Sequence, residues 1–204
     1  MASLRIARIG HMIARVGNSG APMMFLCLLC CLIIYQNWQR SHPEQAPAAL
    51  KAGQHVSAVT VQDIDSNSVR LDWTSGTLPT ILYVFSPDCV WCKKNLTAQR
   101  AVVSGTAGRY RFIGLSTTKD GLPEYIAANH IDYPVYVITR GSTAQRILAV
   151  RGTPETIVIS RSGVVQSKWS GAYGEETRKQ ISSLLAVSIP PLPLSPSAPP
   201  TTPE

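Results

Sequence analysis

Residues that bind metals or staple a small fold are scarce in this sequence. The 204 residues include only four histidines and five cysteines. Three of those cysteines, Cys27, Cys30 and Cys31, lie inside an apolar run, where cysteine packs as a small apolar side chain. A structural zinc site would need a second Cys or His pair beside Cys89 and Cys92, and the sequence has none. We therefore expect no metal centre, no cofactor and no disulfide-stapled scaffold.

Charged residues are also sparse, at 15% of the chain, and their distribution excludes several functions. The net charge is +7, but from residue 41 onward there are fifteen basic and twelve acidic side chains. A nucleic-acid-binding protein would show a dense basic face with interleaved aromatic residues, and none is visible. The sequence also lacks a Ser/His/Asp arrangement and a phosphate-binding loop. We expect no nucleic-acid partner.

One long stretch carries no charge at all. Residues 16–39 contain no Asp, Glu, Lys or Arg, and the run from Met23 to Tyr35 is strongly apolar. Arginines precede this stretch, and Tyr35 and Trp38 suit the interface at its other end. The pattern predicts a basic cytoplasmic N-terminus at residues 1–20 and a transmembrane signal-anchor at residues 21–38. The chain would then be a single-pass membrane protein whose domain faces the periplasm or another extracytoplasmic side.

A cleaved signal peptide is the alternative for the same stretch. Cleavage would need a small-x-small site within a few residues of the apolar run, and residues 35–40 offer none. The small residues Ala46-Pro47-Ala48 are distant and include an awkward proline. The sequence therefore favours the uncleaved anchor.

The remainder of the chain divides into a linker, one domain and a tail. Residues 39–55 lack periodicity and are predicted to be a linker. Residues 56–187 suffice for one ordinary domain, for which we expect a monomer. Residues 188–204 include seven prolines in seventeen positions, which predicts a disordered Pro-rich tail. A ligand for a proline-binding module is the less favoured reading of this tail.

Within residues 56–187, β and α patterns alternate. Residues 80–85 form an almost continuous apolar run, which is typical of a strand buried on both faces. Alternating runs predict two hairpins, at residues 59–73 and 155–169. Further strands are expected at residues 110–116 and 133–138, and helices at residues 93–104, 122–129, 143–150 and 175–187. This order indicates an α/β fold with a central mixed sheet flanked by helices.

A Cys-x-x-Cys pair follows the buried strand. Cys89 stands at the expected start of a helix, where the helix dipole favours an anion and so favours the thiolate. Cys92 lies about one helical turn further on, where it can attack a mixed disulfide formed by Cys89. The pattern indicates a thiol–disulfide exchange site in which Cys89 and Cys92 are the catalytic residues.

With this order of elements, the chain resembles the thioredoxin fold, and within it the membrane-anchored thiol–disulfide oxidoreductases of the TlpA/ResA/CcmG type. The resemblance covers about residues 53–187. It rests on Cys89-Val90-Trp91-Cys92-Lys93-Lys94, similar to the family's Cys-x-x-Cys-Lys-Lys, and on Gly152-Thr153-Pro154-Glu155-Thr156, similar to its cis-proline segment. It implies that Pro154 is cis and packs beside the disulfide, and that the backbone of Thr153 pairs with the substrate chain.

The resemblance also implies a function and partners. Such proteins reduce disulfides of extracytoplasmic proteins, so the expected substrate is a disulfide-containing protein. A membrane thiol protein is expected to supply the electrons. Lys93 and Lys94 would stabilise a nearby thiolate, whereas Asp88 would oppose it, so the sequence leaves the direction of electron flow open.

The chain departs from the family pattern close to the cysteines. Asp88 replaces the usual tryptophan before the first cysteine, and Trp91 replaces the proline that often precedes the second. Asn95 stands where an acid commonly follows the two lysines, and Tyr83 stands where thioredoxin has a buried aspartate. Glu155 is then the nearest acidic candidate for a role in proton transfer. We expect Trp91, Thr153, Pro154 and Glu155 to support the site.

Three other functions stay open. A peroxidase would have Thr or Ser three residues before its cysteine, as Ser86 is, but also proline seven before it, where Leu82 stands. A copper chaperone of the Sco type would use Cys-x-x-x-Cys and a distant histidine, and the spacing here is shorter. A non-catalytic binding domain with a structural disulfide is the broadest alternative. The joint presence of a Cys-x-x-Cys at a helix start and a later Thr-Pro disfavours it.

Overall fold

The computed structural model describes residues 20–41 and 49–193 and divides the chain into two compact units, residues 1–46 and 47–204. In the first unit the described residues form one helix, α1 (Gly20–Ser41), whose side chains from Met24 to Asn37 are all exposed. Among the described helices, none is both long and apolar enough to cross a membrane. The transmembrane anchor at residues 21–38 stays a prediction.

Three further predictions lie wholly or partly outside the described residues. They are the cytoplasmic N-terminus at residues 1–20, of which only Gly20 is described, the linker between residues 42 and 48, and the tail from residue 194 onward.

The second unit is built on one seven-stranded mixed sheet with the strand order β2-β1-β5-β4-β3-β6-β7. Its three central strands, β5, β4 and β3, run parallel to one another, and all other neighbours are antiparallel. The strands are β1 (Val59–Gln62), β2 (Ser68–Leu71), β3 (Thr80–Phe85), β4 (Arg111–Ser116), β5 (Val135–Val137), β6 (Glu155–Ile159) and β7 (Val165–Ser170). The carboxyl ends of β3, β4 and β5 meet at one edge, where ligand sites of parallel sheets form.

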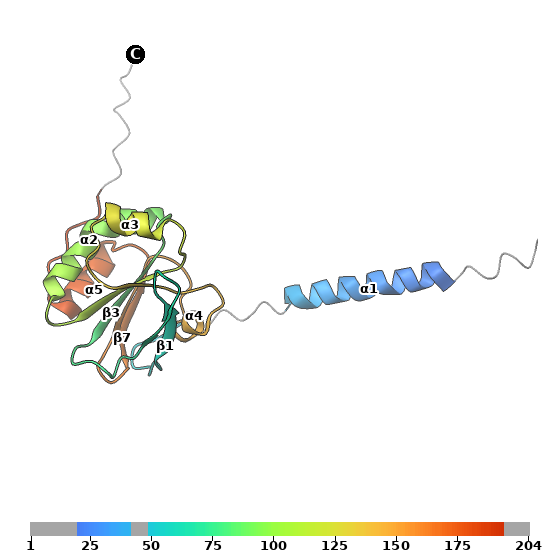
Figure 1. Cartoon of the computed structure of the whole chain (residues 1–204), viewed down its shortest axis with the longest axis horizontal. Coiled ribbons are helices and arrows are strands. Elements are labelled where there is room, and N and C mark those ends of the chain that lie inside the picture. Colours follow the sequence, from blue (N-terminus) through green and yellow to red (C-terminus); the bar gives the residue numbers. More distant parts are fainter. Residues whose placement is uncertain (1–19, 42–48, 194–204) are drawn as a thin grey trace, which may run out of the picture. The chain divides into compact units, whose positions relative to one another are not determined.

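Helices cover both faces of this sheet. On one face, a hydrophobic cluster packs the sheet against α2 (Val90–Thr106), α3 (Leu122–Ala128) and α5 (Glu175–Leu185). On the opposite face, a second cluster packs the sheet against α4 (Thr143–Ile147). Figure 1 shows α2, α3 and α5 together on one side and α4 on the other. All six residues of β3 are buried, which confirms the strand predicted to be covered on both faces.

The predicted domain boundaries are too narrow at both ends. Residues 39–55 were predicted to be a linker, yet Leu50 packs against the core and His55 forms a β-bridge with Val164. The tail was predicted to begin at residue 188, yet Ile189 is buried in the core and its carbonyl accepts a hydrogen bond from Arg178 (3.2 Å). Tertiary contacts hold these segments in place. Such contacts produce no periodic pattern in the sequence, so the sequence could not predict them.

Candidate active site

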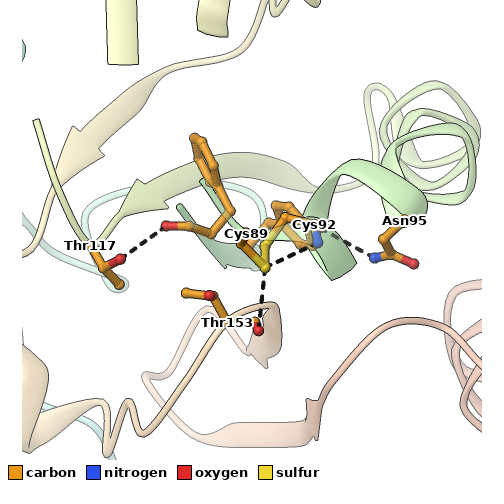
Figure 2. The surroundings of a disulfide bond; sticks show 7 residues. Cys89, Cys92, Asn95, Thr117 and Thr153 are labelled. Carbon is orange, nitrogen blue, oxygen red and sulfur yellow. Dashed lines mark hydrogen bonds between the residues drawn. A yellow bond between two sulfur atoms is a disulfide. The ribbon is translucent and has the colours of Figure 1, made fainter. Parts of the chain in front are cut away.

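Cys89 lies on the turn that joins the central strand β3 to helix α2. Its amide donates to the carbonyl of Ser86 (3.1 Å), which closes the turn, and its own carbonyl accepts from the amide of Lys93 (3.1 Å). The residue is extended, with φ −70° and ψ 112°, and serves as the N-cap of α2. Its Sγ accepts a hydrogen bond from the amide of Cys92 at 3.1 Å (Figure 2). This capping bond starts the helix at Val90, directly after Cys89, where the cysteine motif predicted it.

The two cysteines of the motif are joined in a disulfide. Their Cα atoms are 5.2 Å apart, within the range that a disulfide spans. Cys89 is half-buried, whereas Cys92 is only 1% exposed and packs in the core cluster beneath α2. A substrate sulfur can therefore reach Cys89 but not Cys92. This asymmetry gives the two sulfurs the different roles expected of an attacking and a resolving thiol.

The segment between α4 and β6 forms the wall opposite the disulfide. The Thr153–Pro154 peptide bond is cis, as the resemblance implied, and Pro154 is buried. The carbonyl oxygen of Thr153 lies 3.5 Å from Sγ of Cys89 and faces it in Figure 2. A disulfide sulfur carries no proton, so only the reduced Cys89 thiol could donate a hydrogen bond to this oxygen. That the Thr153 backbone pairs with a substrate chain stays a prediction.

Glu155 is buried, but its carboxylate lies on the face of the sheet opposite to α2. It pairs with Val84 across the two strands, and Val84 belongs to the cluster under α4, whereas Cys92 belongs to the cluster under α2. Its Oε2 is 2.9 Å from Nζ of Lys168, in an ion pair whose side chains are 3% and 9% exposed. A direct role of Glu155 in moving the proton of Cys92 stays a prediction, and this geometry does not favour it.

The ion pair also holds the loop that carries Thr153. Nζ of Lys168 donates to the carbonyls of Leu148 (3.1 Å) and Ala149 (2.6 Å) just after α4. Oε1 of Glu155 accepts from the amide of Arg151 at 3.2 Å. Sequence reasoning did not single out Lys168, because its inward position depends on a register shift between β6 and β7 at Val158 and Ile159.

A neutral polar layer lies beneath Cys92 on the α2 side. Asn95 is completely buried, donates from Nδ2 to the hydroxyl of Tyr83 (3.3 Å) and accepts at Oδ1 from the amide of Tyr173 (2.9 Å). The hydroxyl of Tyr173 shares a hydrogen bond with Thr156 (2.8 Å). Burial raises the pKa values of Tyr83 and Tyr173, so both phenols stay protonated in the physiological range. Among the described residues, Glu155 is the one buried acid, so this layer contains no carboxylate.

Trp91 and Val90 form an exposed apolar edge beside the disulfide. Their side chains are 56% and 62% exposed. The Lys94 ammonium lies 4.8 Å from the centre of the Trp91 ring, in a cation–π contact. The structure thus brings Trp91 to the site as predicted, while its supporting role stays a prediction.

The predicted site residues do not all share one environment. Cys89, Cys92, Thr153 and Pro154 meet at one place, and Trp91 lies at its edge. The carboxylate of Glu155 lies behind this group, on the other face of the sheet. In the described part of the chain, no group of three or more His, Cys, Asp or Glu side chains is placed to hold a metal ion.

The solved structures similar to this chain include thiol-disulfide oxidoreductases and a peroxidoxin. The thioredoxin domain of a thiol-disulfide oxidoreductase from Bacteroides vulgatus is 17% identical, with TM-score 0.52, over 67% of this chain and 99% of that one. A Chlorobium tepidum protein described as the thiol:disulfide interchange protein DsbE is 18% identical, with TM-score 0.55, over 68% and 98%. The peroxidoxin BcpB from Mycobacterium tuberculosis is 20% identical, with TM-score 0.55, over 67% and 97%.

Comparison by sequence adds no relatives, since no family model and no curated protein matches the chain. Sequence identities of 17%, 18% and 20% establish a shared fold and not a shared activity. The similarities cover about two thirds of this chain and nearly all of each similar structure. Residues of the second unit therefore adopt a thioredoxin-like fold, with Cys89 and Cys92 at the start of its first helix and a cis-proline opposite them.

Proposed function

We propose that the chain is a thiol–disulfide oxidoreductase that reduces disulfides of protein substrates with the Cys89–Cys92 pair. The observation that carries this proposal is the arrangement of the two sulfurs. The reachable sulfur of Cys89 caps a helix, the buried sulfur of Cys92 is bonded to it, and the Thr153 carbonyl lies 3.5 Å from Cys89 on the other side. A purely structural disulfide has no need of an accessible sulfur at a helix N-terminus.

The first chemical step uses the reduced pair. The Cys89 thiolate attacks one sulfur of the substrate disulfide, a new S–S bond forms, and the substrate's second sulfur leaves as a thiolate that takes up a proton. The Cys92 amide, which donates to Sγ of Cys89, and the dipole of α2 stabilise the attacking thiolate. Because the neighbouring Asn95 and Tyr83 are neutral, they add no negative charge that would oppose it.

The second step releases the substrate. Cys92 loses its proton and attacks Sγ of Cys89, the mixed disulfide breaks, and the substrate's remaining sulfur leaves as a thiolate and is protonated. The sum is the transfer of two electrons from the cysteine pair to the substrate, while Cys92 gives up one proton and solvent supplies the other. A thiol protein in the membrane is the proposed electron donor that returns the pair to its reduced form, and the proposed working state is a monomer.

Turnover of a protein disulfide tests this function. The full chain with dithiothreitol as electron source is expected to speed the reduction of insulin disulfides many-fold over dithiothreitol alone. Replacing insulin with hydrogen peroxide tests the alternative function, a peroxidase, which the similarity to a peroxidoxin suggests. We expect little peroxide consumption, because Leu82, buried in β3, takes the place of the proline in the peroxidase motif. Peroxide turnover without insulin turnover would contradict the proposal.

We also propose that the uncharged stretch at residues 16–39 anchors the chain to a membrane, with residues 47–204 on the extracytoplasmic side. Support comes from the absence of charge over residues 16–39, the arginines before it, and the exposed apolar side chains along α1. After alkaline carbonate extraction of membranes, we expect the full chain in the pellet and a chain lacking residues 1–46 in the supernatant. Recovery of the full chain in the supernatant would rule out the anchor.

A further inference from the structure

We propose that a basic cleft beside the disulfide selects substrates with an acidic side chain near their reactive cysteine. This inference rests on the proposed function and names a substrate class for the same site. The basic cleft has a volume of about 350 Å³, and its lining includes Thr117, Arg140, Gln145, Arg151 and Thr153.

The position of the cleft ties it to the cysteine pair. Thr117 follows the carboxyl end of β4, and its amide donates to the carbonyl of Phe85, the last residue of β3, at 2.9 Å. Its hydroxyl also lies 3.5 Å from that carbonyl (Figure 2). Thr153, on the other wall, has its carbonyl 3.5 Å from Sγ of Cys89. The cleft therefore opens at the same sheet edge as the disulfide.

A substrate chain held at Cys89 would pass the cleft at close range. An extended chain advances about 3.3 Å per residue, so a side chain roughly one to three positions from the reactive cysteine reaches the cleft from a mixed disulfide. Val90 and Trp91, which follow Cys89 in the chain, are also exposed to a bound substrate.

The charge of the cleft has one sign. Two of its lining residues, Arg140 and Arg151, are basic and exposed, and none of the lining residues is acidic. No hydrogen bond or ion pair to another described residue engages the exposed Arg140 guanidinium, so its donors are available to a ligand. The nearby carboxylate of Glu155 does not cancel this charge, because it is buried and paired with Lys168.

A carboxylate suits this arrangement better than other side chains. Guanidinium groups bind carboxylates through two parallel hydrogen bonds, which is geometrically specific as well as favourable. The amide of Gln145 is engaged inside the protein, since its Oε1 accepts from the Gly141 amide (2.6 Å) and its Nε2 donates to the Val150 carbonyl (3.4 Å). The Arg140 guanidinium is therefore the recognition group of the cleft, and we assign the cleft to Asp or Glu of the substrate.

The test compares three disulfide peptides that differ only two residues from the reactive cysteine, where they carry Glu, Gln or Lys. For the full chain we expect kcat/KM to be about 3- to 10-fold higher for the Glu peptide than for the Gln peptide at low salt, and lowest for the Lys peptide. High salt should compress these differences. Arg140→Gln should lower kcat/KM for the Glu peptide by about the same factor and leave the Gln peptide unchanged.

Arg161→Gln is the matched control, because Arg161 is an exposed arginine in the β6–β7 turn, at the other end of β6 from Thr153. It should change neither peptide. Equal kcat/KM for the Glu and Gln peptides in the full chain would overturn the inference and leave the proposed function standing. An equal loss for both peptides in Arg140→Gln would also overturn it, because it would show a structural role. Absence of turnover for every peptide would overturn the proposed function and this inference with it.

Discussion

Cys89→Ala is expected to abolish insulin reduction, with a loss of more than about 10³-fold, because it removes the nucleophile. Cys92→Ala is expected to fail differently. Its Cys89 can still attack the substrate, but no buried thiol remains to release it, so the mixed disulfide should accumulate. Intact mass spectrometry would detect it as an adduct of the substrate's mass on Cys89.

The matched background for both variants is a chain in which the exposed cysteines of α1, Cys27, Cys30 and Cys31, are alanine. This background should keep the turnover of the unmodified chain. Wild-type turnover by Cys89→Ala would contradict the proposed mechanism. Full turnover by Cys92→Ala would show that Cys92 does not resolve the mixed disulfide.

Lys168→Met is expected to destabilise the second unit by about 3–5 kcal/mol, because it leaves a buried carboxylate without its partner. Oε2 of Glu155 makes no hydrogen bond to any described residue, so the charge of Lys168 is its main compensation. The substitution also removes the Lys168 ammonium that donates hydrogen bonds to the carbonyls of Leu148 and Ala149. Urea unfolding measures the free-energy change directly.

Two comparisons separate the ion pair from general disruption. Glu155→Gln combined with Lys168→Met removes both charges and should recover most of the lost stability, because methionine fills a similar volume. Lys179→Met breaks the exposed Glu175–Lys179 pair and should leave the unfolding midpoint nearly unchanged. A loss below about 1 kcal/mol for Lys168→Met would mean that water reaches the carboxylate and that the pair does not hold the Thr153 loop.

The strongest sequence signals predicted the fold and the centre of the site. The apolar run of β3 had only one plausible environment, a strand covered on both faces, and the structure buries all six residues. The cysteine spacing placed Cys89 at a helix start, and the resemblance carried by the Thr-Pro motif implied the cis bond that the structure contains. Each of these features depends on residues close together in the sequence.

Features that depend on long-range packing were not predictable in the same way. Strict alternation along β7 puts Lys168 and Val165 on opposite faces, yet a bulge between Val158 and Ile159 shifts the register with β6. That shift turns Lys168 toward the cluster that contains Val165 and turns Trp169 to the other cluster. The bond from the Tyr173 amide to Asn95 joins residues 78 positions apart, so no local pattern reveals it.

The central claim is that Cys89 and Cys92 form a reversible redox pair, and its most direct test is a redox titration. The full chain with its α1 cysteines replaced is equilibrated over a glutathione and dithiothreitol series, and free thiols are counted by alkylation and mass spectrometry. We predict a single two-electron transition in which both cysteines titrate together, with a midpoint nearer that of thioredoxin (about −270 mV) than that of the oxidant DsbA (about −120 mV). A midpoint near −120 mV, on that same scale, would reverse the proposed direction of electron flow, and the absence of any transition would contradict the account itself.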